Sequence, residues 1–136
     1  MRYMLDTNIC IYLIRHHSRE VVAKLVDCVE GDVVMSAITL AELRYGVECR
    51  PADRTVQEDQ VAALVEAVPA IAFDEDAAAA YGPVRFATRE RTTDALDKLI
   101  AAHALSLGLT LITNNEQDFR AYPGLAIENW ASTASA

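Results

Sequence analysis

Residues 94–115, DALDKLIAAHALSLGLTLITNN, pass from an amphipathic helix directly into a short apolar strand. Residues 94–107 have the apolar spacing of a helix, and Gly108 is the residue type that commonly ends one. Residues 109–113 are apolar and partly β-branched, which favours a buried strand. A helix that leads into a buried strand is the repeating unit of an α/β fold with a parallel sheet.

The same alternation continues toward both ends of the chain. Apolar runs predict further strands over residues 2–5, 33–36, 71–73 and 125–127. Helical spacing predicts helices over residues 8–15, 18–30, 39–47, 55–68 and 75–90, with a kink or break at Gly82–Pro83 and a helical turn over 116–120. This order predicts a three-layer α/β/α domain, in which a central, mainly parallel sheet of four to five strands has helices on both faces. We expect one domain over residues 1–130 and a disordered tail over residues 131–136.

Composition agrees with one compact domain. The chain has 136 residues, 52% of them hydrophobic, with 5 Gly and 4 Pro, which argues against disorder and against a turn-rich all-β fold. No apolar run approaches the ~18 residues that cross a bilayer, and the start lacks a signal-peptide core, so we expect a cytoplasmic protein with no membrane partner. Three cysteines at spacings that fit no common zinc site are expected to be buried thiols in a reducing compartment: Cys10, Cys28 and Cys49.

Four acids lie where such a sheet builds a ligand site. Asp6 follows the first strand, Asp118 lies one helical turn beyond the strand at 109–113, and Glu42 and Asp97 lie near the starts of helices. Ligands bind at the carboxyl ends of parallel strands, where these positions meet. Each acid alone could be a cap or favour the helix dipole. However, Glu42 and Asp97 lie among apolar neighbours, where a carboxylate is costly unless a cation meets it, and this indicates a hard divalent cation.

One or two Mg²⁺ ions held by carboxylates suit phosphodiester hydrolysis, because they activate water without a side-chain nucleophile. The histidines are poorer candidates: His16 and His17 lie at the polar end of a helix, and His103 is expected to be packed and hydrogen-bonded. No Gly-rich phosphate loop or G-x-S-x-G motif occurs. The net charge of −8 alone argues against nucleic acid, but carboxylates that hold a metal contribute to that charge.

These segments resemble PIN-domain ribonucleases, and in particular the VapC toxins of type II toxin–antitoxin systems. MLDTNICIYLI resembles the first motif, SAITLAELRYGVE the second, DKLIAAHALSLGLTLITNNEQDF the third and fourth, and PGLAIENW the VapC ending, so the resemblance covers nearly the whole chain. It implies a PIN fold, Mg²⁺ or Mn²⁺ dependence, RNA cleavage, a homodimer, and neutralisation by a VapB-type antitoxin in a hetero-oligomer. The TNN and PG…I..W patterns are most similar to VapC proteins that cleave initiator tRNA in the anticodon stem-loop.

The resemblance assigns the first three motif acids to Asp6, Glu42 and Asp97. It implies that Asp6 and Asp97 are direct metal ligands, and that Glu42 is a ligand or positions the water. Thr7 and Asn8 are then expected to orient Asp6.

The fourth motif departs from the usual pattern, because Asn114 and Asn115 follow Thr113 where many PIN proteins have an acid. We expect either that Asp118 or Glu116 supplies the negative charge of this missing acid, or that Asn115 holds a metal-bound water. Thr113 is expected to contact metal or phosphate.

A second departure precedes the third motif, where ERTTDALD lacks the Gly/Pro loop of VapC relatives. We expect Asp94 to be an N-cap, with metal ligation as the open alternative. RNA contacts need cations, and the candidates near the second and third motifs are Arg44, Arg85, Arg89, Arg91 and Lys98. A solvated helix face is an equally good interpretation of each.

The apolar stripes of the 18–30 and 55–68 helices predict a groove for an amphipathic antitoxin helix, or ordinary core. Two other functions stay open. An aspartyl-phosphate phosphotransferase would use Asp6 as nucleophile, although the second Asp of D-x-D is replaced by Asn8. A catalytically weak PIN-like module would bind only its partner.

Overall fold

A computed structural model of the chain describes residues 1–15 and 18–131. The predictions for His16 and His17, and for the tail beyond Ala131, lie outside the described residues. The elements in chain order are β1 (Tyr3–Leu5), α1 (Thr7–Arg15), α2 (Arg19–Val26), β2 (Val33–Ser36), α3 (Ala37–Glu48), the 3₁₀ turn η1 (Pro51–Asp53), α4 (Arg54–Ala67), β3 (Ala70–Ile71), α5 (Glu75–Ala87), α6 (Ala95–Leu107), β4 (Thr110–Ile112), α7 (Glu116–Phe119) and β5 (Ile127–Glu128).

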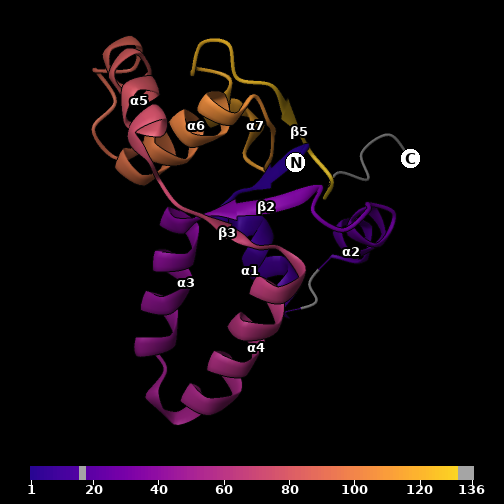
Figure 1. Cartoon of the computed structure of the whole chain (residues 1–136). Helices are drawn as coiled ribbons and strands as arrows, with labels where there is room; N and C mark the ends of the chain where they lie inside the picture. Colours follow the sequence, from indigo (N-terminus) through magenta and orange to yellow (C-terminus); the bar gives the residue numbers. More distant parts are fainter. Residues whose placement is uncertain (16–17, 132–136) are drawn as a thin grey trace.

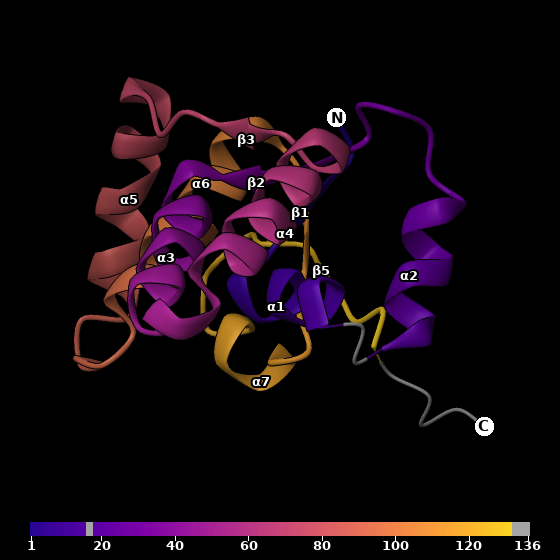
Figure 2. The same cartoon turned by 90° about the horizontal axis from the view of Figure 1, so that it is seen from below.

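The five strands form one parallel sheet in the order β3-β2-β1-β4-β5, with β1 at its centre. Figure 1 shows α5, α6 and α7 on one side of the sheet, and α1, α3 and α4 on the other. In Figure 2, seen from below, α3 and α4 lie side by side across the sheet, and they also contact each other directly. The predicted three-layer α/β/α architecture is therefore confirmed.

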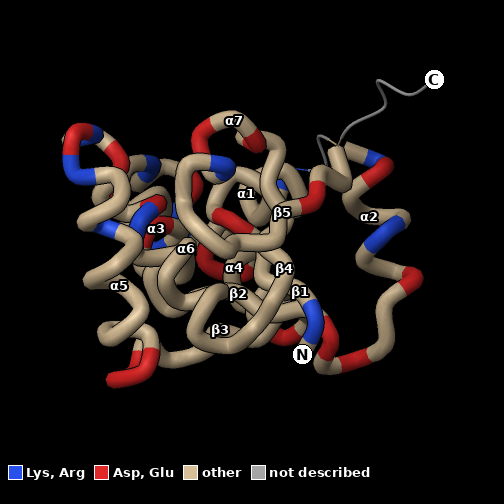
Figure 3. The backbone as a smooth tube through the Cα atoms, turned by 90° about the horizontal axis from the view of Figure 1, so that it is seen from above, with Lys and Arg blue, Asp and Glu red and all other residues tan. Residues whose placement is uncertain are grey.

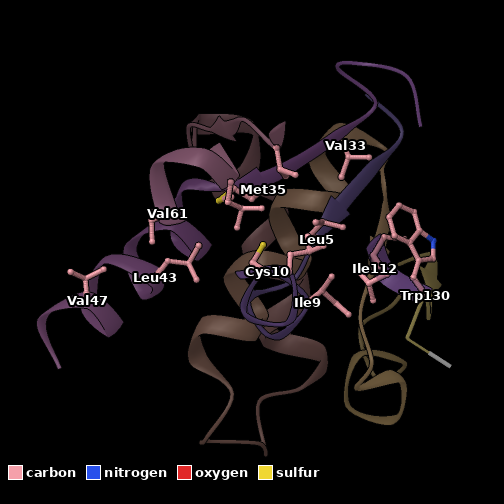
Figure 4. Packing of buried hydrophobic residues seen from close by; sticks show 14 residues of the cluster. Leu5, Ile9, Cys10, Val33, Met35, Leu43, Val47, Val61, Ile112 and Trp130 are labelled. Atoms are coloured by element: carbon pink, nitrogen blue, oxygen red, sulfur yellow. The ribbon is translucent and has the colours of Figure 1, made fainter. Parts of the chain in front are cut away.

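Alternate residues of the central strands pack into two separate hydrophobic cores, one on each face of the sheet. Leu5, Met35 and Ile112 join the cluster that packs against α1, α3 and α4, as Figure 4 shows for these three residues. Met4 and Leu111 point to the other face, where the cluster includes residues of α5 and α6. Side chains of a strand alternate between faces, so a sheet covered on both faces needs continuous apolar strands, which these are.

Side-chain caps fix the starts of three helices. Ser18, Ser36 and Asp74 accept hydrogen bonds from the backbone N–H groups of Val21, Ile38 and Ala77. These bonds satisfy amides that a helix start otherwise leaves without a partner.

Two predicted helix boundaries are wrong. The 18–30 helix ends at Val26, because the chain turns back toward β2 through Gly31, which has a φ of +90°. Val26 and Val29 are consequently exposed instead of joining an apolar stripe. The expected break at Gly82–Pro83 does not occur, since α5 runs from Glu75 to Ala87 with Pro83 on its solvent side.

The three cysteines are free thiols, and only Cys10 is fully buried; Cys28 is half-buried and Cys49 is exposed at the end of α3. Burial is thus confirmed for Cys10 and wrong for Cys49. Over residues 1–15 and 18–131, no helix combines the length and the apolar character needed to cross a bilayer.

Candidate active site

The four predicted acids are electrostatically coupled at the carboxyl edge of the sheet. Asp6 directly follows β1, Glu42 lies on α3, Asp97 lies in the first turn of α6 and Asp118 lies on α7. Burial is the main cause of the raised pKa values of Asp6 and Asp97; the charges of Asp97 and Glu42 raise the pKa of Asp6 further, and those of Glu42 and Asp118 raise that of Asp97. The sheet therefore brings together side chains that are up to 112 residues apart in sequence, from Asp6 to Asp118.

Asp6 is the buried centre of this group, with 4% of its surface exposed. Burial raises its pKa to about 6, although hydrogen bonds from the Thr113 hydroxyl and the Ile9 backbone favour the ionised form. The Ile9 amide lies 2.9 Å from Asp6 Oδ1. A carboxylate so desolvated, with acids as neighbours, is the environment that a bound cation relieves.

Asp97 is partly buried beside the same acids. Burial raises its pKa above the usual value, and the charges of Glu42, Asp94 and Asp118 raise it further, while Arg91 acts in the opposite direction. Asp6 and Asp97 thus both have a raised pKa, as expected for carboxyl groups that are buried and lie beside like charges.

Thr7 and Thr113 each form a hydrogen bond to one of the acids, and Thr7 does not bond the acid that was predicted. Thr7 donates to Glu42 Oε1 at 2.7 Å and lies 3.3 Å from the buried hydroxyl of Thr39, so it positions Glu42 and not Asp6. Thr113 bonds Asp6 instead and accepts from the Asn115 amide at 2.9 Å. Asn8 is exposed in the first turn of α1. Thr39 was not among the predicted site residues, although it is the threonine of the T-x-x-E pattern that ends at Glu42.

Asp118 and Glu116, the two acids that could supply the fourth charge, have different contacts. Asn115 donates to Asp118 Oδ2 at 2.8 Å, and the charge of Asp118 contributes to the raised pKa of Asp97. Glu116 is occupied elsewhere, since it accepts from Asn129 at 3.2 Å and lies 3.5 Å from Arg120. Of these two acids, Asp118 is therefore the one whose charge acts on Asp97.

The donor set fits a hard cation. Carboxylate oxygens are the ligands that Mg²⁺ takes in proteins, usually one or two of them with several waters. Among the described residues, no three or more His, Cys, Asp or Glu side chains are grouped so that they could hold a metal ion by themselves, so at most two protein carboxylates would bind an ion directly and water would supply its other ligands. Asp6 and Asp97 would hold the ion, with Glu42 and Asp118 beside it.

Asp94 occupies the N-cap position of α6, but its side chain makes no capping bond. It is buried, accepts from the Tyr122 hydroxyl at 2.7 Å, and pairs with Lys98 at 3.1 Å and Arg91 at 3.2 Å. Burial alone would raise its pKa, but these hydrogen bonds and charges outweigh burial and hold the pKa below its usual value. Asp94 thus stands at the predicted N-cap position, but its side chain does not cap the helix and is paired with Lys98 and Arg91.

Two of the predicted RNA-binding cations are used inside the protein. Lys98 is buried and donates to the carbonyls of Thr88 and Arg91 at 3.0 and 2.7 Å, so its assignment to RNA is wrong. Arg91 pairs with Asp94 and donates to the Asp118 carbonyl at 2.9 Å, which ties α7 to the start of α6. Arg44, Arg85 and Arg89 are exposed.

His103 is buried within the fold, as predicted. Its Nδ1 lies 2.8 Å from Ser36 Oγ and its ring contacts Phe73 edge-on. Burial lowers its pKa, so the ring is neutral at pH 7 and joins α6 to the start of α3.

A groove of about 520 Å³ lies between α1, α3 and α4. Its apolar lining includes Ile14, Leu43, Val47, Val56 and Val61, and Glu42 also lines it. No residue of α2 lines this groove, and Val21 of α2 lies with Val61 and Leu64 of α4 in one buried cluster, so of the two alternatives for these stripes the structure shows ordinary core. The physical reason that α2 does not line the groove is that it ends early and α1 contacts α4 in its place.

The family described as the PIN domain matches residues 3–125. Ribonuclease VapC2 of Rickettsia felis is 33% identical over 96% of this chain and 98% of its own length. The chain belongs to the VapC family of PIN-domain ribonucleases. The tRNA(fMet)-specific endonuclease VapC of Shigella flexneri is 32% identical over 96% of this chain and 99% of its own.

Solved VapC complexes have the same fold. VapBC2 from Rickettsia felis, bound to a DNA fragment from its promoter, superposes with a TM-score of 0.86 at 32% identity over 96% of this chain and 99% of that chain. VapBC-1 from nontypeable Haemophilus influenzae superposes with a TM-score of 0.86 at 32% identity, over 97% of this chain and 100% of that chain. The PIN-like fold and the VapC family expected from the sequence motifs are confirmed.

Proposed function

We propose that this protein is the toxin of a type II toxin–antitoxin pair and hydrolyses RNA phosphodiester bonds with Mg²⁺, or Mn²⁺ in its place. The observation that carries the proposal is the buried Asp6 carboxylate, whose pKa is raised to about 6 beside Asp97 and Glu42. Such a cluster is unfavourable in an empty fold and favourable around a cation.

Each residue of the cluster then has a separate task. Asp6 and Asp97 hold the cation, and Asp118 adds negative charge on the side of α7. Glu42, which accepts a hydrogen bond from Thr7, would position the attacking water and accept its proton. When bound, Mg²⁺ neutralises the carboxylates, polarises the phosphate and favours deprotonation of water. The Thr113 hydroxyl keeps Asp6 in one orientation.

The substrate proposed is tRNA, specifically the anticodon region of initiator tRNA. This specificity rests on the relative from Shigella flexneri, which is named a tRNA(fMet)-specific endonuclease. The similarity extends over nearly the whole of both chains, so it includes the motif segments and the surfaces around them.

The partner proposed is a VapB-type antitoxin, because similar solved structures are VapBC complexes. An antitoxin segment in the groove between α1, α3 and α4 would pass Glu42 and so reach the acid cluster. A homodimer and a cytoplasmic location complete the proposal.

The test is cleavage of total bacterial tRNA by purified, antitoxin-free protein in Mg²⁺, Mn²⁺ or EDTA. Wild type should release discrete fragments only with metal, and Asp97→Asn should release none. Glu116→Gln is the matched control, because Glu116 faces Asn129 and Arg120, and it should retain cleavage. Fragments that persist in EDTA, or no fragments from well-folded wild type, would refute the proposal.

A further inference from the structure

A second pocket, of about 350 Å³, lies where α5 ends and α6 begins. Three arginines line it, Arg85, Arg89 and Arg91, together with Tyr81 and Thr92. The whole chain has only 12 Lys and Arg against 20 Asp and Glu, so three arginines around one pocket are a local reversal of its charge. Figure 3 shows blue segments gathered along the end of α5 and the turn after it.

The positive charge of this pocket is not cancelled by its own lining. Asp94 is the one acid among the lining residues, and it is buried and already paired with Lys98 and Arg91. Arg85 and Arg89 are exposed, and within the described part of the chain neither forms an ion pair with a carboxylate. Two guanidinium groups thus remain available to an anion from solvent.

An aromatic ring that does not itself line the pocket lies beside one of these arginines, Arg89. Phe86 on α5 is 67% exposed, and the Arg89 guanidinium lies 4.2 Å from its ring centroid. Arg89 also donates to the Phe86 carbonyl at 2.8 Å, which holds the guanidinium over the ring. Exposed aromatic rings beside basic groups are the elements with which proteins bind single-stranded nucleic acid, because bases stack on the rings while phosphates meet the cations.

The pocket and the acid cluster both include residues at the start of α6, although none of the four acids lines the pocket. Asp94 and Ala95 line the pocket, and Asp97 lies within the next turn of the same helix. Arg91 joins the two places directly, because it lines the pocket and donates to the carbonyl of Asp118. An extended strand that places a phosphate at the acids can therefore place a neighbouring nucleotide at the pocket.

We propose that this pocket anchors the substrate RNA beside the cleaved bond, with Arg85 and Arg89 contacting backbone phosphates and one unpaired base stacking on Phe86. The inference rests on the proposed function in taking RNA as the substrate. It gives this acidic protein a way to bind RNA that does not depend on the metal site.

The test measures binding without cleavage. A fluorescein-labelled single-stranded RNA oligonucleotide is titrated with protein in EDTA, and anisotropy gives the dissociation constant between 50 and 200 mM salt. Arg85→Ala/Arg89→Ala should weaken binding roughly tenfold near 0.1 M salt, and should lower the slope of log affinity against log salt by about 0.7 per arginine.

The matched control removes the same charge elsewhere. Arg19→Ala/Arg50→Ala changes two exposed arginines, at the start of α2 and beyond the end of α3, and should alter affinity by less than about threefold. Phe86→Leu should weaken binding about fivefold or more without changing the salt slope, because it removes stacking and no charge. Equal effects of the two double variants would overturn the phosphate site, and unchanged binding by Phe86→Leu would overturn the stacking site.

Two further measurements separate this inference from its alternatives. If wild type cleaves RNA with Mg²⁺ but its binding ignores Arg85 and Arg89, the pocket assignment fails and the proposed function stands. If binding depends on both arginines but no RNA is cleaved, the proposed function fails and the pocket stands. Light scattering gives the molar mass, and so the oligomeric state, of the Arg85→Ala/Arg89→Ala variant, which should equal that of wild type. A changed molar mass together with lost RNA binding would show that this face is an interface between copies of the chain, and would overturn the assignment.

Discussion

In the candidate site, the ionised form of Asp6 is energetically unfavourable, because its carboxylate is buried. Its side chain is buried after β1, and it receives hydrogen bonds from Ile9 and Thr113 that only partly offset the loss of solvent. No protein cation pairs with it among the described residues. Removing its charge should therefore stabilise the metal-free protein while it removes activity, which is the usual sign of a functional carboxylate.

The raised pKa of Asp6 also predicts how the stability of the protein depends on pH. The pKa of Asp6 is about 6 in the folded chain against 3.8 for an unperturbed carboxyl, so the folded state binds the proton more tightly. Its contribution to stability therefore falls as pH rises from about 4 to about 6. In EDTA at pH 7.5, Asp6→Asn should raise the free energy of unfolding by roughly 1–3 kcal/mol, and the gain should shrink at pH 4.5. Urea titrations at both pH values check this, and a variant less stable than wild type at pH 7.5 would contradict it.

Asp94 has the opposite character, because its charge is paired inside the protein. Its carboxylate lies 3.1 Å from Lys98 and 3.2 Å from Arg91, and Lys98 is itself buried. Asp94→Ala would leave a buried cation without its partner, and we expect a loss of about 3–5 kcal/mol at pH 7. Thermal unfolding measures this loss, with the exposed Glu90→Ala as a control that should stay within about 0.5 kcal/mol. A small loss in Asp94→Ala would show that the pair is not structural.

At this scale the sequence identifies residue types better than their partners. Asp6, Glu42 and Asp97 could be predicted because motif spacing places them at one sheet edge. The network of Asp94 could not, since it depends on Tyr122, which is 28 residues away and reaches Asp94 only through tertiary packing. Thr7 illustrates the same limit: adjacency to Asp6 suggested a contact, yet its hydroxyl donates to Glu42 across 35 residues.

Among the elements, α6 and β4 connect the fold to the site. α6 carries Asp97 in its first turn and ends at Gly108 in the left-handed conformation, after which β4 pairs with the central strand β1. The caps at Ser18 and Asp74 and the helix end at Gly108 agree with the sequence within a residue or two. The end of α2 does not, because Gly31, which follows the predicted 18–30 helix, belongs to the turn before β2, and α2 already ends at Val26.

Two glycine substitutions should have opposite effects on stability. Gly108 has a φ of +66° with nothing within 4 Å of an added Cβ, so Gly108→Ala should lose about 1 kcal/mol from backbone strain alone. Gly46 lies inside α3 with equally open space, so Gly46→Ala should gain roughly 0.5–1 kcal/mol. Urea unfolding of both variants decides this, and effects of the same sign would contradict the assigned conformations.

For the whole molecule, the layered architecture separates two surfaces around one site. The apolar groove lies between α1, α3 and α4, and the basic pocket lies at the ends of α5 and α6. Glu42 lines the groove, and Asp94 and Ala95 line the pocket, so the acids lie between the two surfaces. The three layers were predictable from alternating elements, whereas the groove was not, because it depends on how α1 packs between its neighbours.

The groove predicts which substitutions separate antitoxin binding from cleavage. Val56 on α4 lines the groove and is largely exposed, so Val56→Asp should weaken binding of the cognate VapB-type antitoxin at least about tenfold while RNA cleavage persists. Val26→Asp on α2 is the matched control, equally apolar and exposed but away from the groove, and should bind normally. Calorimetric titration distinguishes them; lost binding by Val26→Asp alone would place the antitoxin on α2.

The claim that the acids at the sheet edge form a divalent-cation site is tested most directly by Mn²⁺ binding. The paramagnetic resonance signal of free Mn²⁺ falls as protein binds the ion, and this can be followed at pH 7.5, where Asp6 is ionised. We predict that wild type removes Mn²⁺ from solution, that Asp6→Asn and Asp97→Asn lose this binding, and that the exposed Asp76→Asn on α5 keeps it. Binding that survives in both Asp6→Asn and Asp97→Asn would contradict a metal site at these residues.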